Sequence, residues 1–291
     1  MRRLILVILA CATLLPSLAQ AYDILVLQSR RDPACEEVLK GFCANRHASQ
    51  RVIVLADFAE VDVVRIVRED RPRLVLAVGD SARMIRNTPI IALMTLAIHN
   101  QDNNQSNLTG ISMFAPPERY TRIFQDLRRR RIGVIHNPAK TGWYLRQARK
   151  AAREAGVELV VQEVSAPRDT LARFTAFTGK VDALWMLPDT TAVTRETVEA
   201  YFRYAQEQGI PLISFAASHL GLGSATVIDI DRSGLGSQAA AMADRILGGA
   251  SPNDIPLEYP DACTLKTNQN ILKRLGLAML ELVKVAFYVK E

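Results

Sequence analysis

The chain of 291 residues is 49% apolar, which is enough for a large core in one or two domains. Its formal charge of +6 becomes +4 without Arg2 and Arg3, because the 36 basic residues fall to 34 against 30 acidic ones. So mild and dispersed a charge argues against a nucleic-acid partner. The densest basic run, Arg128–Arg131, stands at an expected helix end, where cations suit the helix dipole. A patch for an anionic membrane or a partner is the alternative.

The first 21 residues have the pattern of a secretory signal peptide. Two arginines precede an apolar run from Leu4 to Leu15, and Ala19-Gln20-Ala21 is a small-residue cleavage site. The apolar run is shorter than the roughly 20 residues that a membrane span needs. We therefore predict cleavage after Ala21 and a mature protein that is periplasmic or secreted. A lipoprotein at Cys11 and an uncleaved N-terminal anchor are the alternatives.

Three cysteines remain after cleavage: Cys35, Cys43 and Cys263. Cys35 and Cys43 fall in one expected helix, about 12 Å apart along its axis. That separation exceeds the Cα distance that a disulfide spans. The sequence predicts buried free thiols, and one pair involving Cys263 is the alternative.

Strand and helix patterns alternate from the start of the mature chain. The expected strands are short apolar runs, as in sheets that are covered on both faces. Such alternation predicts a parallel, doubly wound sheet. The expected strands are Asp23–Leu27, Val52–Leu55, Leu74–Val78 and Ile90–Met94, and the expected helices are Pro33–His47, Glu60–Asp70 and Ser81–Arg86.

The same alternation restarts after the polar segment Asn100–Asn107. Two sets of about four strand–helix units predict two similar lobes. The second set has expected strands at Arg131–His136, Val157–Val161, Ala183–Leu187 and Pro211–Ser214, and expected helices at Tyr144–Ala155, Arg168–Phe177 and Thr194–Gln208.

The C-terminal part continues with a strand, a helix and an apolar end. Thr226–Ile230 is an expected strand, and Leu235–Leu247 is an expected helix that Gly248-Gly249 ends as a C-cap. Residues Ile271–Val289 are apolar but interrupted by charges, so we expect a packed terminal helix rather than a membrane span.

An ordered set of short motifs resembles the ABC transporter substrate-binding family, whose members handle aromatic amino acids and related small ligands. The resemblance covers nearly the whole mature chain. Its motifs are Ile24–Gln28 with Asp32-Pro33 and Gly41-Phe42, Arg73–Gly79 with Ser81-Ala82, Asn107–Ser112, Arg131–Ile135 with Asn137-Pro138, Pro188-Asp189 with Val193-Thr194, Leu235-Gly236 with Gln238–Ala240, and Leu265–Thr267 with Leu275–Leu277.

The resemblance implies a type I periplasmic-binding fold: two doubly wound α/β lobes joined by a hinge that the chain crosses three times. Lobe one would comprise residues 22–112 and 225–250, with Thr226–Ile230 completing its sheet. Lobe two would comprise residues 113–224 and 251–291. One departure concerns the cleft, because relatives carry a Thr-Asp-Pro turn where this chain reads Met94–His99.

Ligands of open parallel sheets lie beyond the carboxyl ends of the strands, which selects the candidate binding residues. Asp80 and Ser81 open a helix whose N–H groups attract a carboxylate, although plain helix capping is the alternative. Arg30 suits a carboxylate if it is not a surface charge, and Asp189 suits an ammonium if it is not a cap. Phe215 would stack on an apolar ligand if it is not part of the core. The full predicted set is Gln28, Ser29, Arg30, Asp80, Ser81, Thr95, Asn137, Asp189, Thr190, Ser214, Phe215 and Asp231.

Enzymatic signals in the sequence are poor. The four histidines, His47, His99, His136 and His219, have no metal-ligand spacing, and no G-x-S-x-G elbow occurs. We therefore predict no catalytic residue, no metal and no cofactor. The resemblance implies a monomeric solute-binding component of an ABC-type importer. It would bind a small carboxylate or amino-acid-like ligand, first of all an aromatic amino acid, and deliver it to an inner-membrane permease. The alternative is a ligand-sensing partner of a membrane sensor.

Overall fold

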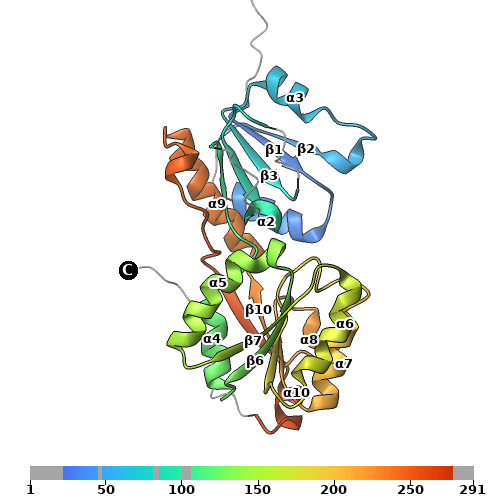
Figure 1. Cartoon of the computed structure of the whole chain (residues 1–291). Helices are drawn as coiled ribbons and strands as arrows, with labels where there is room; N and C mark the ends of the chain where they lie inside the picture. The colour runs from blue at the N-terminus through green and yellow to red at the C-terminus, as the bar shows by residue number, and fades with distance from the viewer. Residues whose placement is uncertain (1–21, 45–47, 81–84, 100–105, 278–291) are drawn as a thin grey trace, which may run out of the picture.

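The computed structural model describes residues 22–44, 48–80, 85–99 and 106–277. Two sheets, parallel except for one strand of the second, form the centres of two lobes that lie end to end (Figure 1). The expected two-lobed α/β architecture is confirmed. The expected signal peptide and most of the expected helix Ser81–Arg86 lie outside the described residues.

The first sheet has strand order β2-β1-β3-β4-β5, and every pair in it is parallel. All residues of β1, β3 and β4 are buried, as continuous apolar strands predict. Its strands are β1 (Ile24–Gln28), β2 (Gln50–Val54), β3 (Leu74–Val78), β4 (Ile90–Leu93) and β5 (Leu108–Gly110).

The second sheet has strand order β11-β10-β9-β8-β6-β7, and only β11 is antiparallel. Its strands are β6 (Arg131–His136), β7 (Glu158–Glu163), β8 (Ala183–Trp185), β9 (Leu212–Ser214), β10 (Thr226–Ile230) and β11 (Cys263–Thr267).

The prediction that Thr226–Ile230 completes the first sheet is wrong. Strand β10 pairs in parallel with β9 and antiparallel with β11, both in the second sheet. Only a short helix, α8, lies between β9 and β10, and consecutive elements joined by so short a connection usually lie side by side.

Helices cover the sheets, and most of them begin at a side-chain cap that is legible in the sequence. Asp32, Asp62, Asn137, Asp231 and Asn268 each accept a hydrogen bond from a backbone N–H of the helix that follows. The helices are α2 (Pro33–Cys43), α3 (Val63–Asp70), α4 (Pro117–Asp126), α5 (Pro138–Glu154), α6 (Thr170–Arg173), α7 (Val198–Gln208), α8 (His219–Leu222), α9 (Arg232–Leu247) and α10 (Gln269–Arg274).

Among the described residues, three segments pass between the lobes: those after β5, after β10 and after α9. Helix α9 returns to the first sheet and packs against α2, so the first lobe comprises β1–β5, α2, α3 and α9 (Figure 1). The remaining elements form the second lobe. The first and third crossing segments lie side by side, since Ser112 N donates to Glu258 O at 2.8 Å.

The three cysteines within the described residues, Cys35, Cys43 and Cys263, are free. Cys35 is buried in the first lobe and Cys263 in the second, and burial raises the pKa of each thiol to about 11. Both thiols are therefore protonated at neutral pH and weakly reactive.

Candidate functional site

A cavity of about 330 Å³ lies between the lobes, at the carboxyl ends of their strands. Its volume falls within the range of small-molecule sites. The first lobe contributes the residues that follow β3 and β4, and the second lobe contributes those that follow β5, β6 and β8. The lining residues are Asp80, Met94, Thr95, Leu96 and Ala97 from the first lobe, and Phe114, Lys140, Thr141, Pro188 and Thr190 from the second.

The first-lobe wall presents a carboxylate that its neighbours hold in place. Asp80 comes directly after Gly79, whose φ of +92° is open to glycine and strained for other residues. A Cβ at Gly79 would lie 2.4 Å from Ser29 Oγ, so both the turn and the space require glycine. Thr95 Oγ1 donates to Asp80 Oδ1 and accepts from Ala97 N. The Met94–His99 loop thus orients Asp80 through Thr95.

The second-lobe wall presents a cation at the N-terminus of α5. Asn137 caps this helix, because its Oδ1 accepts from Ala139 N at 2.9 Å and its carbonyl accepts from the N–H groups of Lys140 and Thr141. Since these N–H groups are satisfied, attraction for an anion comes from the Lys140 ammonium and the helix dipole. Lys140 is exposed and has no ion-pair partner among the described residues.

Asp189 lies behind the second-lobe wall and is only 1% exposed. Its Oδ2 accepts from Asn137 N at 2.8 Å and from Thr141 Oγ1 at 2.7 Å. Its Oδ1 accepts from the N–H groups of Thr191 and Ala192. The carboxylate therefore ties the start of α5 to the loop after β8, and it does not line the cavity.

An aromatic contact joins the lobes beside the cavity. The rings of His99, in the first lobe, and Trp143, on α5, are stacked with centroids 3.5 Å apart. Phe114 packs edge-on against both rings. His99 Nε2 lies 2.9 Å from Ser112 Oγ, in the first crossing segment. The contact therefore involves the two walls and the hinge together.

Burial lowers the pKa of His99 to about 4, so the stack holds a neutral ring at pH 7. The unfolded chain takes up this proton near pH 6.5, before the folded protein does, so stability falls as the pH drops from about 6.5 towards 4. Between pH 7 and 5, the wild type should lose about 1–2 kcal/mol more unfolding free energy than His99→Gln. Urea denaturation at both pH values measures this difference. Equal losses in the two proteins would contradict the role of His99, because the other histidines are common to both.

Three of the predicted residues, Asp80, Thr95 and Thr190, line the cavity. Asn137 and Asp189 support its wall from behind. Ser81 lies outside the described residues.

The other predicted residues are engaged elsewhere. Gln28 Nε2 donates to Arg30 O, and Arg30 forms an exposed ion pair with Asp32. Ser29 N donates to Val78 O, next to the turn that carries Asp80. Ser214 is fully buried and Phe215 packs edge-on against His219. Asp231 caps α9 at the second crossing, where its Oδ1 accepts from Gly234 N.

The sequence analysis missed Lys140 and Thr141 because it placed the start of helix α5 at Tyr144. The helix begins at Pro138, and Asn137-Pro138 is a cap followed by proline at the first helical position, which is a recognised start signal. Met94 and Leu96 lie in the Met94–His99 loop, which the sequence placed at the cleft without assigning them a contact, and Phe114 carried no distinguishing signal.

Other kinds of site find no support in the described part of the chain. Within it, no group of three His, Cys, Asp or Glu side chains is placed to hold a metal ion. No helix there is long and apolar enough to cross a membrane.

Comparison with known proteins identifies related sequences. A family model described as ABC transporter substrate binding protein matches residues 58–290. The tyrosine-binding protein of Clostridioides difficile (strain R20291) is 24% identical over 189 residues, 64% of this chain. The chain spans only about half of that relative, 54% of its length.

Solved structures show the same fold. The ABC domain in complex with L-Trp from Streptococcus pneumonia has a TM-score of 0.61 at 19% identity, covering 89% of this chain and 95% of that one. The ligand-free, open structure of a substrate binding protein with adhesive properties from Clostridium difficile has a TM-score of 0.65 at 19% identity, covering 90% and 97%. The fold is therefore of the type I periplasmic-binding class.

Proposed function

Because the chain belongs to the family of ABC transporter substrate-binding proteins, we propose that it binds a zwitterionic, amino-acid-like ligand between its lobes. The family is one of binding proteins rather than enzymes, as the sequence led us to expect. The observation that carries the proposal is the pairing of opposite charges across the cavity, with Asp80 on the first lobe and Lys140 on the second.

Each charge suits one end of an amino acid. The Asp80 carboxylate would accept hydrogen bonds from the ligand ammonium, and the Lys140 ammonium would bind the ligand carboxylate. Since the two groups belong to different lobes, a zwitterion contacts both only when the cleft is closed. Ligand binding would therefore favour the closed state by hinge motion.

The apolar lining supports an aromatic or apolar side chain on the ligand. Met94, Leu96, Phe114 and Pro188 line the cavity beside its polar groups. Two of the similar proteins are described as tyrosine-binding and as a complex with L-Trp. An aromatic amino acid is accordingly the first ligand to test.

The proposal places the protein outside the cytoplasm as part of an importer. Cleavage after Ala21 would release a monomeric mature chain into the periplasm or the medium. An inner-membrane ABC permease would be its partner and would receive the ligand from the closed lobes. Fractionation with N-terminal sequencing of the mature protein tests the export step.

A thermal-shift screen over the L-amino acids tests the binding proposal. At a hundredfold excess over Kd, a ligand should stabilise the protein by about 2.7 kcal/mol. The best amino acid should also outperform the same molecule without its amino group or without its carboxyl group. Lys140→Met and Asp80→Asn should each weaken binding of that amino acid by roughly tenfold to a hundredfold, because each loses a charged hydrogen bond.

Lys150→Met is the matched control, since Lys150 is exposed on the same helix but does not line the cavity. It should bind the amino acid as the wild type does. The proposal is wrong if no amino acid shifts the melting temperature, or if the two cavity variants bind like the control.

A further inference from the structure

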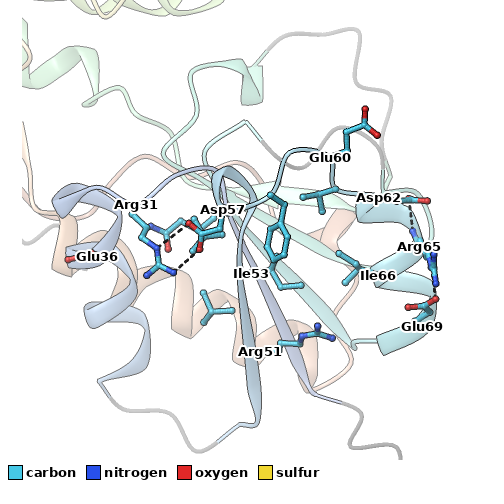
Figure 2. Close-up of a pocket in the computed structure, with 15 residues that line it drawn as sticks. Arg31, Glu36, Arg51, Ile53, Asp57, Glu60, Asp62, Arg65, Ile66 and Glu69 are labelled. Atoms are coloured by element: carbon cyan, nitrogen blue, oxygen red, sulfur yellow. Dashed lines mark hydrogen bonds and ion pairs between the residues drawn. The ribbon is translucent and has the colours of Figure 1, made fainter.

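A second cavity, of about 730 Å³, lies wholly within the first lobe and apart from the interlobe cleft. Figure 2 shows it as a groove along β2, with Arg31 and Glu36 on the α2 side and Arg65 and Glu69 on the α3 side. None of its lining residues lines the interlobe cavity. The proposed function therefore leaves this groove unused.

The floor of the groove is an open sheet edge. Strand β2 is the last strand of its sheet and, in the part of the chain that the structure describes, pairs only with β1. Ile24 is paired with Gln50, and its N–H donates to Ser49 O. In a parallel pair, successive residues of a strand direct their backbone groups alternately towards and away from the neighbouring strand. The backbone groups of Gln50, Val52 and Val54 consequently point away from β1. Within the described residues, these outward N–H and C=O groups have no backbone hydrogen-bond partner.

Exposed apolar side chains accompany this open edge. Val52 is 50% exposed and Phe58 is 57% exposed, although both are large apolar residues. Ile53, which is buried, and Ile66, which is partly buried, also line the groove. Natural sheets usually protect an edge strand with charge, proline or a covering element, and an unprotected apolar edge is a template for another strand.

The charges around the groove define the partner that fits it. Five carboxylates line it against three guanidinium groups, which leaves an excess of two negative charges. Each arginine is already engaged: Arg31 with Asp57, Arg65 with Glu69 and Arg51 with Asp70, at 2.6–2.7 Å. Glu36 and Glu60 have no ion-pair partner among the described residues, so a basic segment would gain partners there. A second copy of this groove would bring the same negative excess and be repelled.

We propose that this groove binds an extended, basic segment of another protein, which adds as a strand to the β2 edge. The outward N–H and C=O groups of Gln50, Val52 and Val54 hydrogen-bond to its backbone. Alternate apolar side chains of the segment cover Val52 and Phe58. Lysine or arginine side chains of the segment pair with the carboxylates at the rim.

Fluorescence anisotropy of the mature protein with labelled peptides tests this proposal. One peptide alternates lysine and valine, and its counterpart alternates glutamate and valine. We expect the basic peptide to bind at least about tenfold more tightly, because like charges at the rim oppose the acidic one. Val52→Pro removes one outward N–H and leaves the face towards β1 unchanged, so it should weaken basic-peptide binding by about tenfold.

Glu60→Lys offers a test that does not touch the strand, and it should weaken basic-peptide binding by at least about threefold. Glu207→Lys, an exposed charge reversal on α7 in the second lobe, should bind the peptide like the wild type.

Equal binding of both peptides, or wild-type affinity of both groove variants, would overturn the proposal. A dimer that light scattering detects and that Val52→Pro dissociates would also overturn the proposal, since the occupant would then be a second copy. Amino-acid binding in the interlobe cavity should be unchanged in every groove variant, which separates this result from the proposed function.

Discussion

Replacing Asp189 by alanine should lower the unfolding free energy by about 3–5 kcal/mol, the largest loss that we expect from a single side chain. Asp189 accepts four hydrogen bonds, and the variant leaves the N–H groups of Asn137, Thr191 and Ala192 without an acceptor in a buried site. Such unsatisfied donors keep their full desolvation cost. Urea denaturation at pH 7, followed by circular dichroism, measures the loss.

Asp189→Asn should recover part of this stability, because its amide oxygen still accepts from two donors. Asp254→Asn is the control and should change stability by less than about 0.5 kcal/mol, since Asp254 is exposed and no side-chain hydrogen bond of it occurs in the described structure. Ligand affinity should fall together with stability in Asp189→Ala, because the start of α5 carries Lys140. A stable Asp189→Ala variant would mean that water satisfies these donors.

Gly236→Ala should destabilise the first lobe by about 3 kcal/mol, although alanine is the better helix former. Gly236 lies on α9 where the helix crosses α2, and an added Cβ would stand 2.0 Å from Val38 O and 2.6 Å from Phe42 N. These are backbone atoms, so no rotamer change relieves the clash and the helices must separate. Thermal or urea unfolding of the purified variant measures the effect.

Gly142→Ala is the matched control for this helix contact. Gly142 lies within α5, and the nearest atom to an added Cβ is Arg146 Nη1 at 3.7 Å, an ordinary contact. Alanine there should stabilise the protein by up to about 1 kcal/mol through helix propensity. If both variants had the same effect on unfolding stability, the close approach of α2 and α9 would not make the protein sensitive to an added Cβ at Gly236.

Much of the fold could be predicted from the sequence. Leu74–Val78 and Thr226–Ile230 are strands with the predicted bounds, because an apolar run bounded by polar residues has few alternatives in an α/β chain. The two sets of strand–helix units also came from local pattern. Asp80, Thr95 and Thr190 were predicted and do line the interlobe cavity.

Only the tertiary structure decided matters that depend on partners distant in sequence. The sheet that β10 joins depends on which edge is free, and the strand's own five residues carry no information about that. Whether Asp189 faces a ligand or the protein depends on donors more than 45 residues away in the chain, such as Asn137.

For the same reason, the two cavities could not be predicted from the residues that line them. The interlobe cavity joins Asp80 and Lys140, whose opposition arises from the folding of two lobes and not from any spacing. The groove on β2 depends on the strand being the last of its sheet, which is a property of strand order. Local pattern determined which residues form strands, helices and caps, because those preferences act over a few residues. The meeting of distant charges and the exposure of an edge were decided by packing, because they are properties of the assembled sheets.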